Sequence, residues 1–432
     1  MINKIFKNSA VKNMSWIMIG KICQSILSLL ISLLTARFLG PANFGIINYA
    51  LAVTTFLIPI MQLGFNNVLV FELQNNKEEE GKIIGTALIL SSISSLFCIV
   101  CCTSFVMFAN YGEKETILIT ILCSMLLFFQ AFDLLQYWFQ SKLLSKYSSI
   151  ASLIAYAVVA GYRIFLLATK SDIIWFALTS SFDYLLIAIL LLIFYKRKGG
   201  QKLSFSKAVG ARMFSSSKHY IFAGLMVVIY GQIDKIMLKL IIGDDETGLY
   251  SIAISFANIL GFVFSAIIDS IRPVIFQHKK AGNKEKYEKT ISVLYHIIAY
   301  LGLIQGLVMT LFAEPLIQLL YGDEYISAAG ALRFLCWYIS FSYFGSIRNI
   351  WLLSEQKQKY LWIINLTGAV LSFTLNLLLI PLIQAQGAAI ASLTTQFVCN
   401  FVLGFIIKPI RGNNSLLIKG LNPMCLVKFW RT

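Results

Sequence analysis

Charged residues are scarce in this sequence of 432 residues. Only 13% of the residues are charged and 58% are hydrophobic, and the mean hydropathy is +0.76. A soluble domain averages roughly 45–50% apolar and 25% charged residues. The composition therefore excludes a soluble globular protein and predicts an all-α integral membrane protein. The net charge of +16 does not indicate a nucleic-acid partner, because the basic residues lie in the connections between apolar segments.

Motifs for catalysis and metal binding are also missing. The sequence has no Gly-x4-Gly-Lys-Ser/Thr phosphate loop and no His-Glu-x2-His pair, so it lacks the usual signatures of nucleotide hydrolysis and zinc proteolysis. The three histidines are scattered, and the eight cysteines form no disulfide or zinc pattern. We therefore expect no catalytic residue, no metal and no cofactor, and we do not expect an enzyme.

Long apolar segments make up most of the chain. A membrane-spanning helix needs about 20 mostly apolar residues. Twelve segments meet this requirement: 13–38, 44–67, 83–109, 116–139, 148–168, 173–195, 216–241, 249–271, 291–313, 328–353, 360–382 and 387–408. Lys and Arg are concentrated in alternate connections, and this asymmetry predicts that both termini are cytoplasmic.

A duplicated turn divides the chain into two halves. Gly40 and Gly45 flank a turn between the first two segments, and Gly243 and Gly248 repeat that spacing 203 residues later. Each half has six spans, so the halves should form two six-helix bundles related by a pseudo-twofold axis along the membrane normal. We predict these parts: an N-terminal bundle at 1–200, a cytoplasmic linker at 201–215, a C-terminal bundle at 216–410 and a basic cytoplasmic tail at 411–432.

Polar residues recur at helical spacing inside the predicted spans. The 203-residue offset aligns the polar face of the second span, which carries Asn48, Thr55 and Gln62, with that of the eighth span, which carries Asn258. Polar side chains that face lipid are costly, so these faces should lie against other helices or water. Helix packing alone would also account for the Ser and Thr residues among them.

Charged residues inside the spans are the main functional candidates. An intramembrane charge indicates a functional site by default. Structural alternatives are pairing between helices and, for Lys235 and Arg348, extension of the side chain to the membrane surface. The cations are Lys21, Arg163, Lys235, Arg333 and Arg348, and the carboxylates include Asp133, Asp183 and Asp234.

Three motifs resemble the polysaccharide flippases of the multidrug/oligosaccharidyl-lipid/polysaccharide (MOP) superfamily. The first is Ala-Arg-Phe-Leu-Gly-Pro-Ala-Asn-Phe-Gly at 36–45. The second is Gln-Ile-Asp-Lys-Ile-Met-Leu at 232–238, followed by Gly-Leu-Tyr at 248–250. The third is Ile-Pro-Leu-Ile-Gln-Ala-Gln-Gly-Ala-Ala-Ile-Ala at 380–391. These turns are mainly structural, so they identify the fold better than the cargo.

The resemblance implies a MATE-like fold with a central cleft that opens alternately to each side of the membrane. The implied cargo is an undecaprenyl-diphosphate-linked oligosaccharide, moved from the inner to the outer leaflet of the bacterial cytoplasmic membrane. Membrane lipids, a polysaccharide polymerase and a chain-length regulator are the other implied partners. For the diphosphate and sugar we expect Lys21, Arg163, Lys235, Arg333, Arg348, Asn48, Gln62 and Asn258. For coupling to H⁺ or Na⁺ we expect Asp133, Asp183 and Asp234.

Three other functions stay open at this point. A multidrug exporter of the same superfamily would carry cationic cargo in an acidic cleft. A peptidoglycan-precursor flippase shares the fold but typically has two further spans, which the residues after Lys408 are too few and too charged to supply. A membrane glycosyltransferase or polymerase is disfavoured by the short external loops.

Overall fold

The computed structural model describes the backbone of residues 9–422 and the side chains of residues 27–422, and these residues form helices and connections without strands. The chain divides into two compact units, Met1–Gln232 and Ile233–Thr432, and the boundary falls inside helix α11, Lys207–Ile241. The boundary therefore lies later in the chain than the predicted linker at 201–215.

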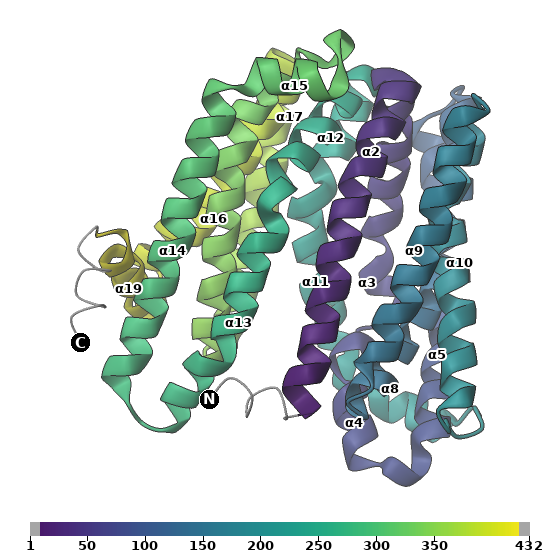
Figure 1. Cartoon of the computed structure of the whole chain (residues 1–432), viewed down its shortest axis with the longest axis vertical. Helices are drawn as coiled ribbons and strands as arrows, with labels where there is room; N and C mark the ends of the chain where they lie inside the picture. Colours follow the sequence, from purple (N-terminus) through teal and green to yellow (C-terminus); the bar gives the residue numbers. More distant parts are fainter. Residues whose placement is uncertain (1–8, 423–432) are drawn as a thin grey trace. The chain divides into compact units, whose positions relative to one another are not determined.

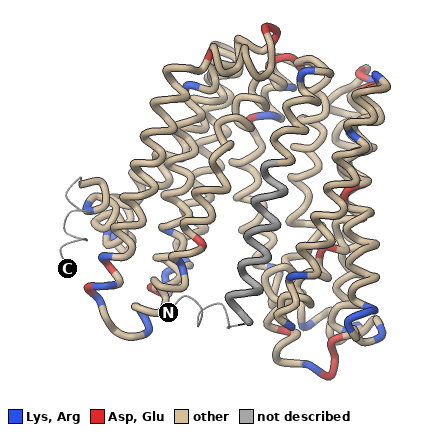
Figure 2. Tube along the Cα trace, viewed as in Figure 1, with Lys and Arg blue, Asp and Glu red and all other residues tan. Residues whose placement is uncertain are grey.

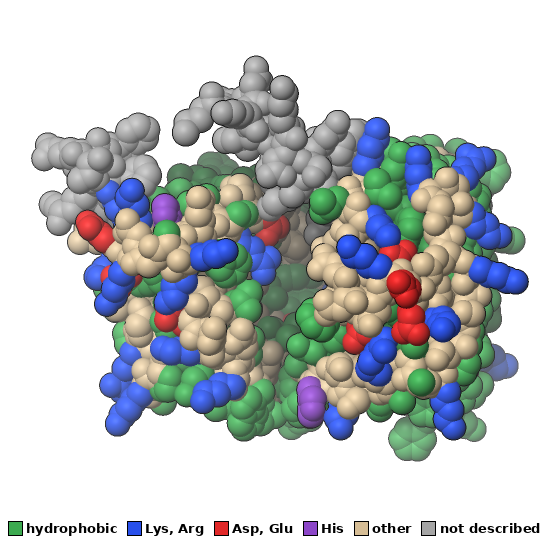
Figure 3. Space-filling view, turned by 90° about the horizontal axis from the view of Figure 1, so that it is seen from below, with side chains coloured by type: hydrophobic (Ala, Val, Ile, Leu, Met, Phe, Trp, Pro, Cys, Tyr) green, Lys and Arg blue, Asp and Glu red, His purple; other side chains and the backbone are tan. Residues whose placement is uncertain are grey.

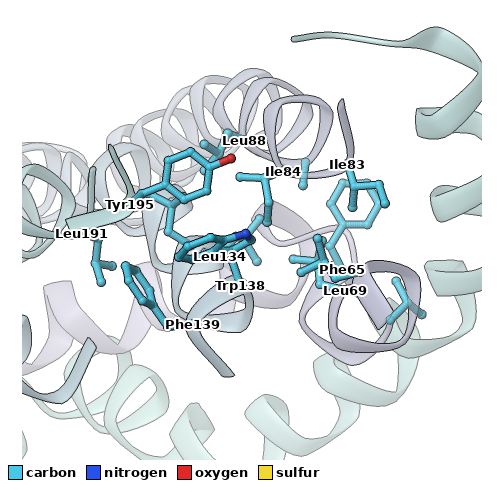
Figure 4. Close-up of a cluster of buried hydrophobic side chains, with 14 of the residues drawn as sticks. Phe65, Leu69, Ile83, Ile84, Leu88, Leu134, Trp138, Phe139, Leu191 and Tyr195 are labelled. Atoms are coloured by element: carbon cyan, nitrogen blue, oxygen red, sulfur yellow. The ribbon is translucent and has the colours of Figure 1, made fainter. Parts of the chain in front are cut away.

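Unit 1 is formed from the N-terminal helices and the first part of α11 (Figure 1). Its helices are α2 (Ser9–Phe56), α3 (Ile58–Met61), α4 (Leu69–Asn75), α5 (Glu80–Ala109), α6 (Lys114–Ser124), α7 (Leu126–Gln130), α8 (Leu135–Ser141), α9 (Ser145–Ala168) and α10 (Ile173–Arg197). One buried core lies where α4, α5, α8 and α10 meet, and the aromatic rings of Trp138, Phe139 and Tyr195 pack together there (Figure 4).

Unit 2 contains the end of α11 and all later helices. These are α12 (Asp244–Ala257), α13 (Gly261–Lys280), α14 (Lys284–Leu311), α15 (Ala313–Tyr321), α16 (Ala328–Ser354), α17 (Leu361–Phe397), α18 (Leu403–Ile406) and α19 (Arg411–Leu421). A π-helical turn, Val398–Val402, lies between α17 and α18.

Nine helical stretches in the described residues are long and apolar enough to cross a membrane. The stretches Leu27–Met61 and Gln358–Ile406 each contain a backbone break and so comprise two predicted spans. Helix α16 carries Arg333 and Arg348 and is not among the nine, although its 27 residues are long enough to span. The helices are consistent with the twelve predicted spans, and the chain is a multi-pass membrane protein.

Glycine makes both copies of the duplicated turn. Gly40 has φ 76° and separates the two straight parts of α2, with Pro41 directly after it. Gly243 has φ 137° and precedes α12. A side chain with a Cβ rarely adopts such angles, so these positions favour glycine. The break at Gly40 lies in the predicted turn between the first two segments.

Helix α17 reverses direction at Ile383 and Gln384, where Gln384 has φ 51°. A Cβ added at Gly387 would clash with the carbonyl oxygen of Leu379, so the segments before and after the break lie against each other. This region corresponds to the predicted turn between the last two spans. The close approach requires glycine at position 387.

Two predicted parts of the chain differ in the structure. The predicted linker packs on unit 1: the amide of Ser204 donates to the carbonyl of Gly81 at 3.2 Å, and the amide of Ser206 donates to Thr86 Oγ1 at 2.9 Å. The first half of the predicted tail is the helix α19, which packs on α14 and buries Asn413 and Leu417. Both segments pack on the rest of their unit through hydrogen bonds or buried side chains. Their polar composition did not predict this packing.

Charged residues gather at the ends of the helices (Figure 2). In unit 1 they cluster beside the connection between α10 and α11, where Arg212 pairs with Glu72 at 3.1 Å. In unit 2 they cluster around the connection between α13 and α14. This distribution follows the alternation in the sequence, and the cytoplasmic assignment of these ends stays a prediction.

We expect Gly387→Ala to destabilise the protein by about 1–3 kcal/mol, because the added methyl group must displace the backbone of Leu379. Gly161→Ala is the matched control, since Gly161 lies in α9 and a Cβ there meets nothing within 4 Å. The control should be neutral or stabilising by up to about 1 kcal/mol. Thermal unfolding of the two variants in detergent measures the difference, and equal midpoints would contradict the proposed close packing.

Candidate functional site

A buried carboxylate forms the best-defined polar site in the described residues. Asp234 lies on the part of α11 that belongs to unit 2, and it is 4% exposed. Three side chains donate hydrogen bonds to it. Tyr250 reaches Asp234 Oδ2 at 2.7 Å, Asn376 Nδ2 reaches Oδ1 at 2.6 Å, and the hydroxyl of Ser392 donates to Oδ2. We call these four residues the Asp234 cluster.

The break in α17 makes the Asp234 cluster possible. Asn376 and Ser392 are sixteen residues apart, which would separate them by about 24 Å along a straight helix. Both contact the same carboxylate because the chain turns back between them, at Ile383 and Gln384. On the opposite side, the turn at Gly243 places Tyr250 beside the same group.

A second contact fixes the turn to the break. The side chain of Glu246, in the first turn of α12, accepts a hydrogen bond of 3.0 Å from the amide of Ala385. Ala385 is the first residue after the break, where the backbone amides lack helical partners. A carboxylate is stabilised at such a position by the helix dipole. This contact joins the Gly243 turn to the break in α17, the two backbone features that bring the Asp234 cluster together.

The cluster presents oxygen atoms to a cation. A carboxylate, two hydroxyl groups and an amide are hard ligands of the kind that Na⁺ and other hard cations prefer. Asn376 Oδ1 is buried and accepts no hydrogen bond within the part of the chain that the structure describes. The described residues contain no group of three or more His, Cys, Asp or Glu side chains, so a site for a transition metal is not indicated there. The cluster suits a proton or a hard monovalent cation.

Two lysines of α11, Lys235 and Lys239, follow Asp234 in the sequence and have different roles. Lys235 is half-buried, and its charge acts on Asp234 although the two side chains are adjacent in the sequence. Lys239 is 6% exposed and pairs with Asp244 at 2.6 Å, across the Gly243 turn. Lys239 therefore stabilises the turn, whereas Lys235 is the predicted cation whose charge acts on Asp234.

Three other predicted charges lie on adjacent elements of unit 1: α9, α10 and the 3-10 turn Ala131–Leu134. Arg163 on α9 donates from Nε to Thr179 Oγ1 of α10 at 3.1 Å. Its charge interacts with that of Asp183 on α10, and Asp183 interacts in turn with Asp133, which lies in the 3-10 turn Ala131–Leu134. The structure thus joins a residue predicted for cargo with two predicted for ion coupling. We call these residues the Arg163 cluster.

Arg348 has partners deep inside unit 2. It is 5% exposed and donates from Nη1 to the carbonyl of Cys399 at 2.7 Å and to Asn400 Oδ1 at 2.8 Å. Cys399 and Asn400 both lie in the π-helical turn. The wider hydrogen-bonding pattern of this turn leaves the carbonyl of Cys399 open to Arg348 of α16. These contacts favour the structural alternative for Arg348, and a part in cargo binding stays a prediction.

Two further predicted residues contact groups outside the two clusters. Arg333 pairs with Glu314 at 2.7 Å, and both side chains are exposed. Asn48 donates to the carbonyl of Phe44, one turn earlier in α2.

Three more predicted positions complete the set. Gln62 follows α3 as a half-buried residue, and Asn258 is exposed at the start of a 3-10 turn. Lys21 belongs to α2, but its side chain lies outside the described side chains.

Sequence reasoning missed three members of the Asp234 cluster. The sequence presents Tyr250 only as part of a motif, and it predicts neither Ser392 nor Asn376 as a site residue. Asn376 and Ser392 lie 142 and 158 residues after Asp234, so helical periodicity cannot connect them. The available signal was that Asn376 is a polar residue in an otherwise apolar span.

The sequence matches two family models and is similar to several known proteins. The family model "Polysaccharide biosynthesis protein" matches residues 10–279, and the model "MatE" matches residues 220–378. The chain is 23% identical over 421 residues to the "Putative O-antigen transporter" of Escherichia coli (strain K12), which covers 95% of this chain and 99% of that protein. It is 26% identical over 214 residues to "Lipid II flippase MurJ" of Bacillus subtilis (strain 168), over 45% of this chain and 38% of that protein.

Two solved structures have a similar fold. An inward-facing multidrug resistance MATE transporter of the MOP superfamily has a TM-score of 0.67 at 14% identity, covering 91% of this chain and 95% of its own. An inward closed conformation of the lipid II flippase MurJ has a TM-score of 0.65 at 17% identity, covering 96% of this chain and 92% of its own. At these identities the similarity shows the fold alone.

We expect Tyr250→Phe to destabilise the protein by about 1.5–3 kcal/mol, because the buried carboxylate loses a charge-assisted hydrogen bond. The same substitution should cost less in an Asp234→Asn background, where no charge needs the donor. A double-mutant cycle of unfolding free energies isolates this coupling. Additive effects would contradict a direct interaction between the two residues.

Proposed function

Since this chain belongs to the polysaccharide biosynthesis family of the MOP superfamily of membrane transporters, we propose that it is a flippase for lipid-linked oligosaccharides. Its family and its all-α membrane fold were both predicted from the sequence, and both predictions are confirmed. The proposed cargo is an undecaprenyl-diphosphate-linked repeat unit of a surface polysaccharide. It would move from the inner to the outer leaflet of the bacterial cytoplasmic membrane by alternating access.

The observation that carries this proposal is the alignment to the E. coli O-antigen transporter, which extends over 95% of this chain. An alignment of that extent includes both units and all the spans of the second one. The proposed polymerase and chain-length regulator partners, and the cytoplasmic position of both termini, are consistent with that role.

The chemistry of the cargo requires buried cations. A diphosphate is recognised by Arg and Lys side chains, and Arg provides the better geometric match to its oxygens. In unit 1 the guanidinium of Arg163 is held by Thr179 and by the charge of Asp183, which keeps it oriented inside the membrane segment. We propose that Arg163 and Lys21 bind the diphosphate. Lys235, Arg333, Asn48, Gln62 and Asn258 are secondary candidates for the diphosphate and the sugars.

Ion coupling would supply the driving force. The chain has no nucleotide-binding loop, so transport must be driven by an ion gradient or by consumption of the cargo outside. We propose that the Asp234 cluster binds the coupling ion, because a buried carboxylate lies there beside two hydroxyl groups and an amide whose Oδ1 is also buried. Asp133 and Asp183 would serve to orient Arg163 and not to bind the ion.

A multidrug exporter is the second candidate function. The "MatE" model matches residues 220–378, a range that contains Asp234, Tyr250 and Asn376. A carboxylate within the membrane is the group that a cationic drug would require. In unit 1 the guanidinium of Arg163 favours an anionic cargo, whereas the carboxylates of Asp133 and Asp183 favour a cationic one. The alignment to the O-antigen transporter is therefore what favours the flippase.

We expect Arg163→Ala and Lys21→Ala to abolish display of the surface polysaccharide, because the diphosphate would lose its counter-charge. Protein level and membrane insertion should not change, and Lys77→Ala, in an exposed connection of unit 1, serves as the matched control. Glycan staining and immunoblotting of complemented cells measure both quantities. Full glycan display by both the Arg163→Ala and the Lys21→Ala variant would rule out the diphosphate site.

The ion proposal makes a separate prediction for purified protein. A ligand that binds only the folded state stabilises it by mass action, so the coupling cation should raise the unfolding midpoint of the native chain. We expect a rise of several degrees with Na⁺ relative to choline, or a matching dependence on pH if the ion is H⁺. Asp234→Asn should remove that dependence, with Glu324→Gln, an exposed carboxylate, as the control. A response that survives Asp234→Asn would refute the site.

A further inference from the structure

A cavity of about 460 Å³ lies at the Lys-rich end of unit 2, away from both clusters described above. It is enclosed by the connection between α13 and α14, the end of α16 and the start of α19. The lining residues are His278, Lys279, Gly282, Asn283, Lys284, Tyr287, Glu288, Trp351, Glu355, Gly412 and Leu416. This volume falls in the range of about 300–1,000 Å³ that is usual for small-molecule sites.

The floor of the cavity is apolar. The side chains of Tyr287, Trp351 and Leu416 are buried within unit 2 and border the cavity. Gly412 keeps the edge of the Trp351 indole open, because a Cβ at that position would lie 3.2 Å from Cζ2 of the ring. A larger residue at 412 would therefore fill the space above the indole.

One wall is a fixed ion pair. Lys279 binds Glu355 at 2.5 Å and lies over the ring of Tyr287, 5.0 Å from its centroid. The hydroxyl of Tyr287 lies 2.5 Å from Ser354 Oγ. Partial burial would raise the pKa of Glu355, but hydrogen bonds from Lys279 and Tyr287 outweigh burial and lower it. This wall holds equal and opposite charges at neutral pH.

A second wall, on α14, carries loosely paired charges. Glu288 lies 3.9 Å from Lys284 and 3.7 Å from Lys419, and the side chains of both lysines are largely exposed. Exposed pairs at such distances contribute little, so a ligand can separate them at low cost. His278 and Lys284 thus remain available to an anionic group, and Glu288 remains available to a cationic one. The positive end of α14 also faces this wall, through Asn283 and Lys284.

We propose that this cavity binds the headgroup of a zwitterionic phospholipid. The phosphate would contact His278 and Lys284, the ammonium group would contact Glu288, and the glycerol region would rest on Trp351 and Leu416. A simple anion would meet Glu288 and Glu355, and a simple cation would meet Lys279 and Lys284. Only a ligand with both charges matches the two walls.

The position of the cavity in the chain supports a lipid as the occupant. Trp and Tyr side chains are enriched at the membrane–water interface, where the headgroups of phospholipids lie. Figure 3 views the Lys- and Arg-rich ends of the helices, where the connections of unit 2 present basic side chains. A bound lipid would link α14, α16 and α19, which otherwise meet through contacts such as Tyr295 with Asn413 at 3.0 Å.

The test measures lipid retained by the purified full-length chain. Native mass spectrometry would count bound lipid after addition of phosphatidylethanolamine, phosphatidylcholine, phosphatidylglycerol or diacylglycerol. We expect one zwitterionic lipid per chain, retained about tenfold more strongly than phosphatidylglycerol, and no retention of diacylglycerol, which lacks the phosphate.

Two variants locate the site and test its charge logic. Gly412→Leu should abolish retention by filling the space above Trp351, whereas Gly161→Leu, in an open position of α9, should retain the lipid. Glu288→Lys changes a partly exposed side chain and should reverse the preference toward phosphatidylglycerol. This second variant tests the site even if Gly412→Leu fails to fold.

Three results would overturn the proposal: equal retention of phosphatidylglycerol and phosphatidylethanolamine by the native chain, an unchanged preference in Glu288→Lys, or full retention by a folded Gly412→Leu variant. None of these results depends on the cargo or on Asp234, so the lipid site and the flippase function are tested independently.

Discussion

The carboxylate of Asp234 is the constraint on which much of unit 2 depends. A charged group inside a membrane segment has no water to solvate it, so the protein must supply every hydrogen-bond donor. Here the donors come from α12 and from both sides of the break in α17. The Gly243 turn and the reversal at Gln384 are the backbone features that bring these donors together, and the contact from Glu246 to Ala385 joins them.

The two units carry different polar chemistry on a shared helical plan. Unit 1 holds the guanidinium of Arg163 on the hydroxyl of Thr179, where the charge of Asp183 acts on it, and unit 2 places one carboxylate among neutral donors. An ion-driven flippase of phosphorylated cargo needs two elements. One is a positively charged site for the anionic headgroup, and the other is a negatively charged site for the coupling cation. Duplication supplies the scaffold for both, and divergence at a few buried positions assigns them separate roles in our proposal.

Much of the fold could be predicted from the sequence, because apolar length, Gly and Pro placement and charge alternation act locally. The breaks at Gly40 and Gly243 follow from such signals. Of the Asp234 cluster, only Asp234 itself could be predicted, because a charged residue in an apolar segment can be recognised without knowing its partners. Its partners Asn376 and Ser392 depend on a chain reversal more than 140 residues away. The packing of α19 was also not predicted, because its apolar residues are too few to distinguish it from a solvated tail.

Reconstitution of the purified chain in liposomes tests the central claim most directly. Undecaprenyl-diphosphate-linked oligosaccharide would be placed in both leaflets, and its exposure to an impermeant glycan-modifying enzyme would be followed over time. Our account predicts that the native chain exposes the protected half of this cargo faster than protein-free liposomes do, and that Arg163→Ala does not. Movement of a cationic drug without any movement of the lipid-linked oligosaccharide would contradict it.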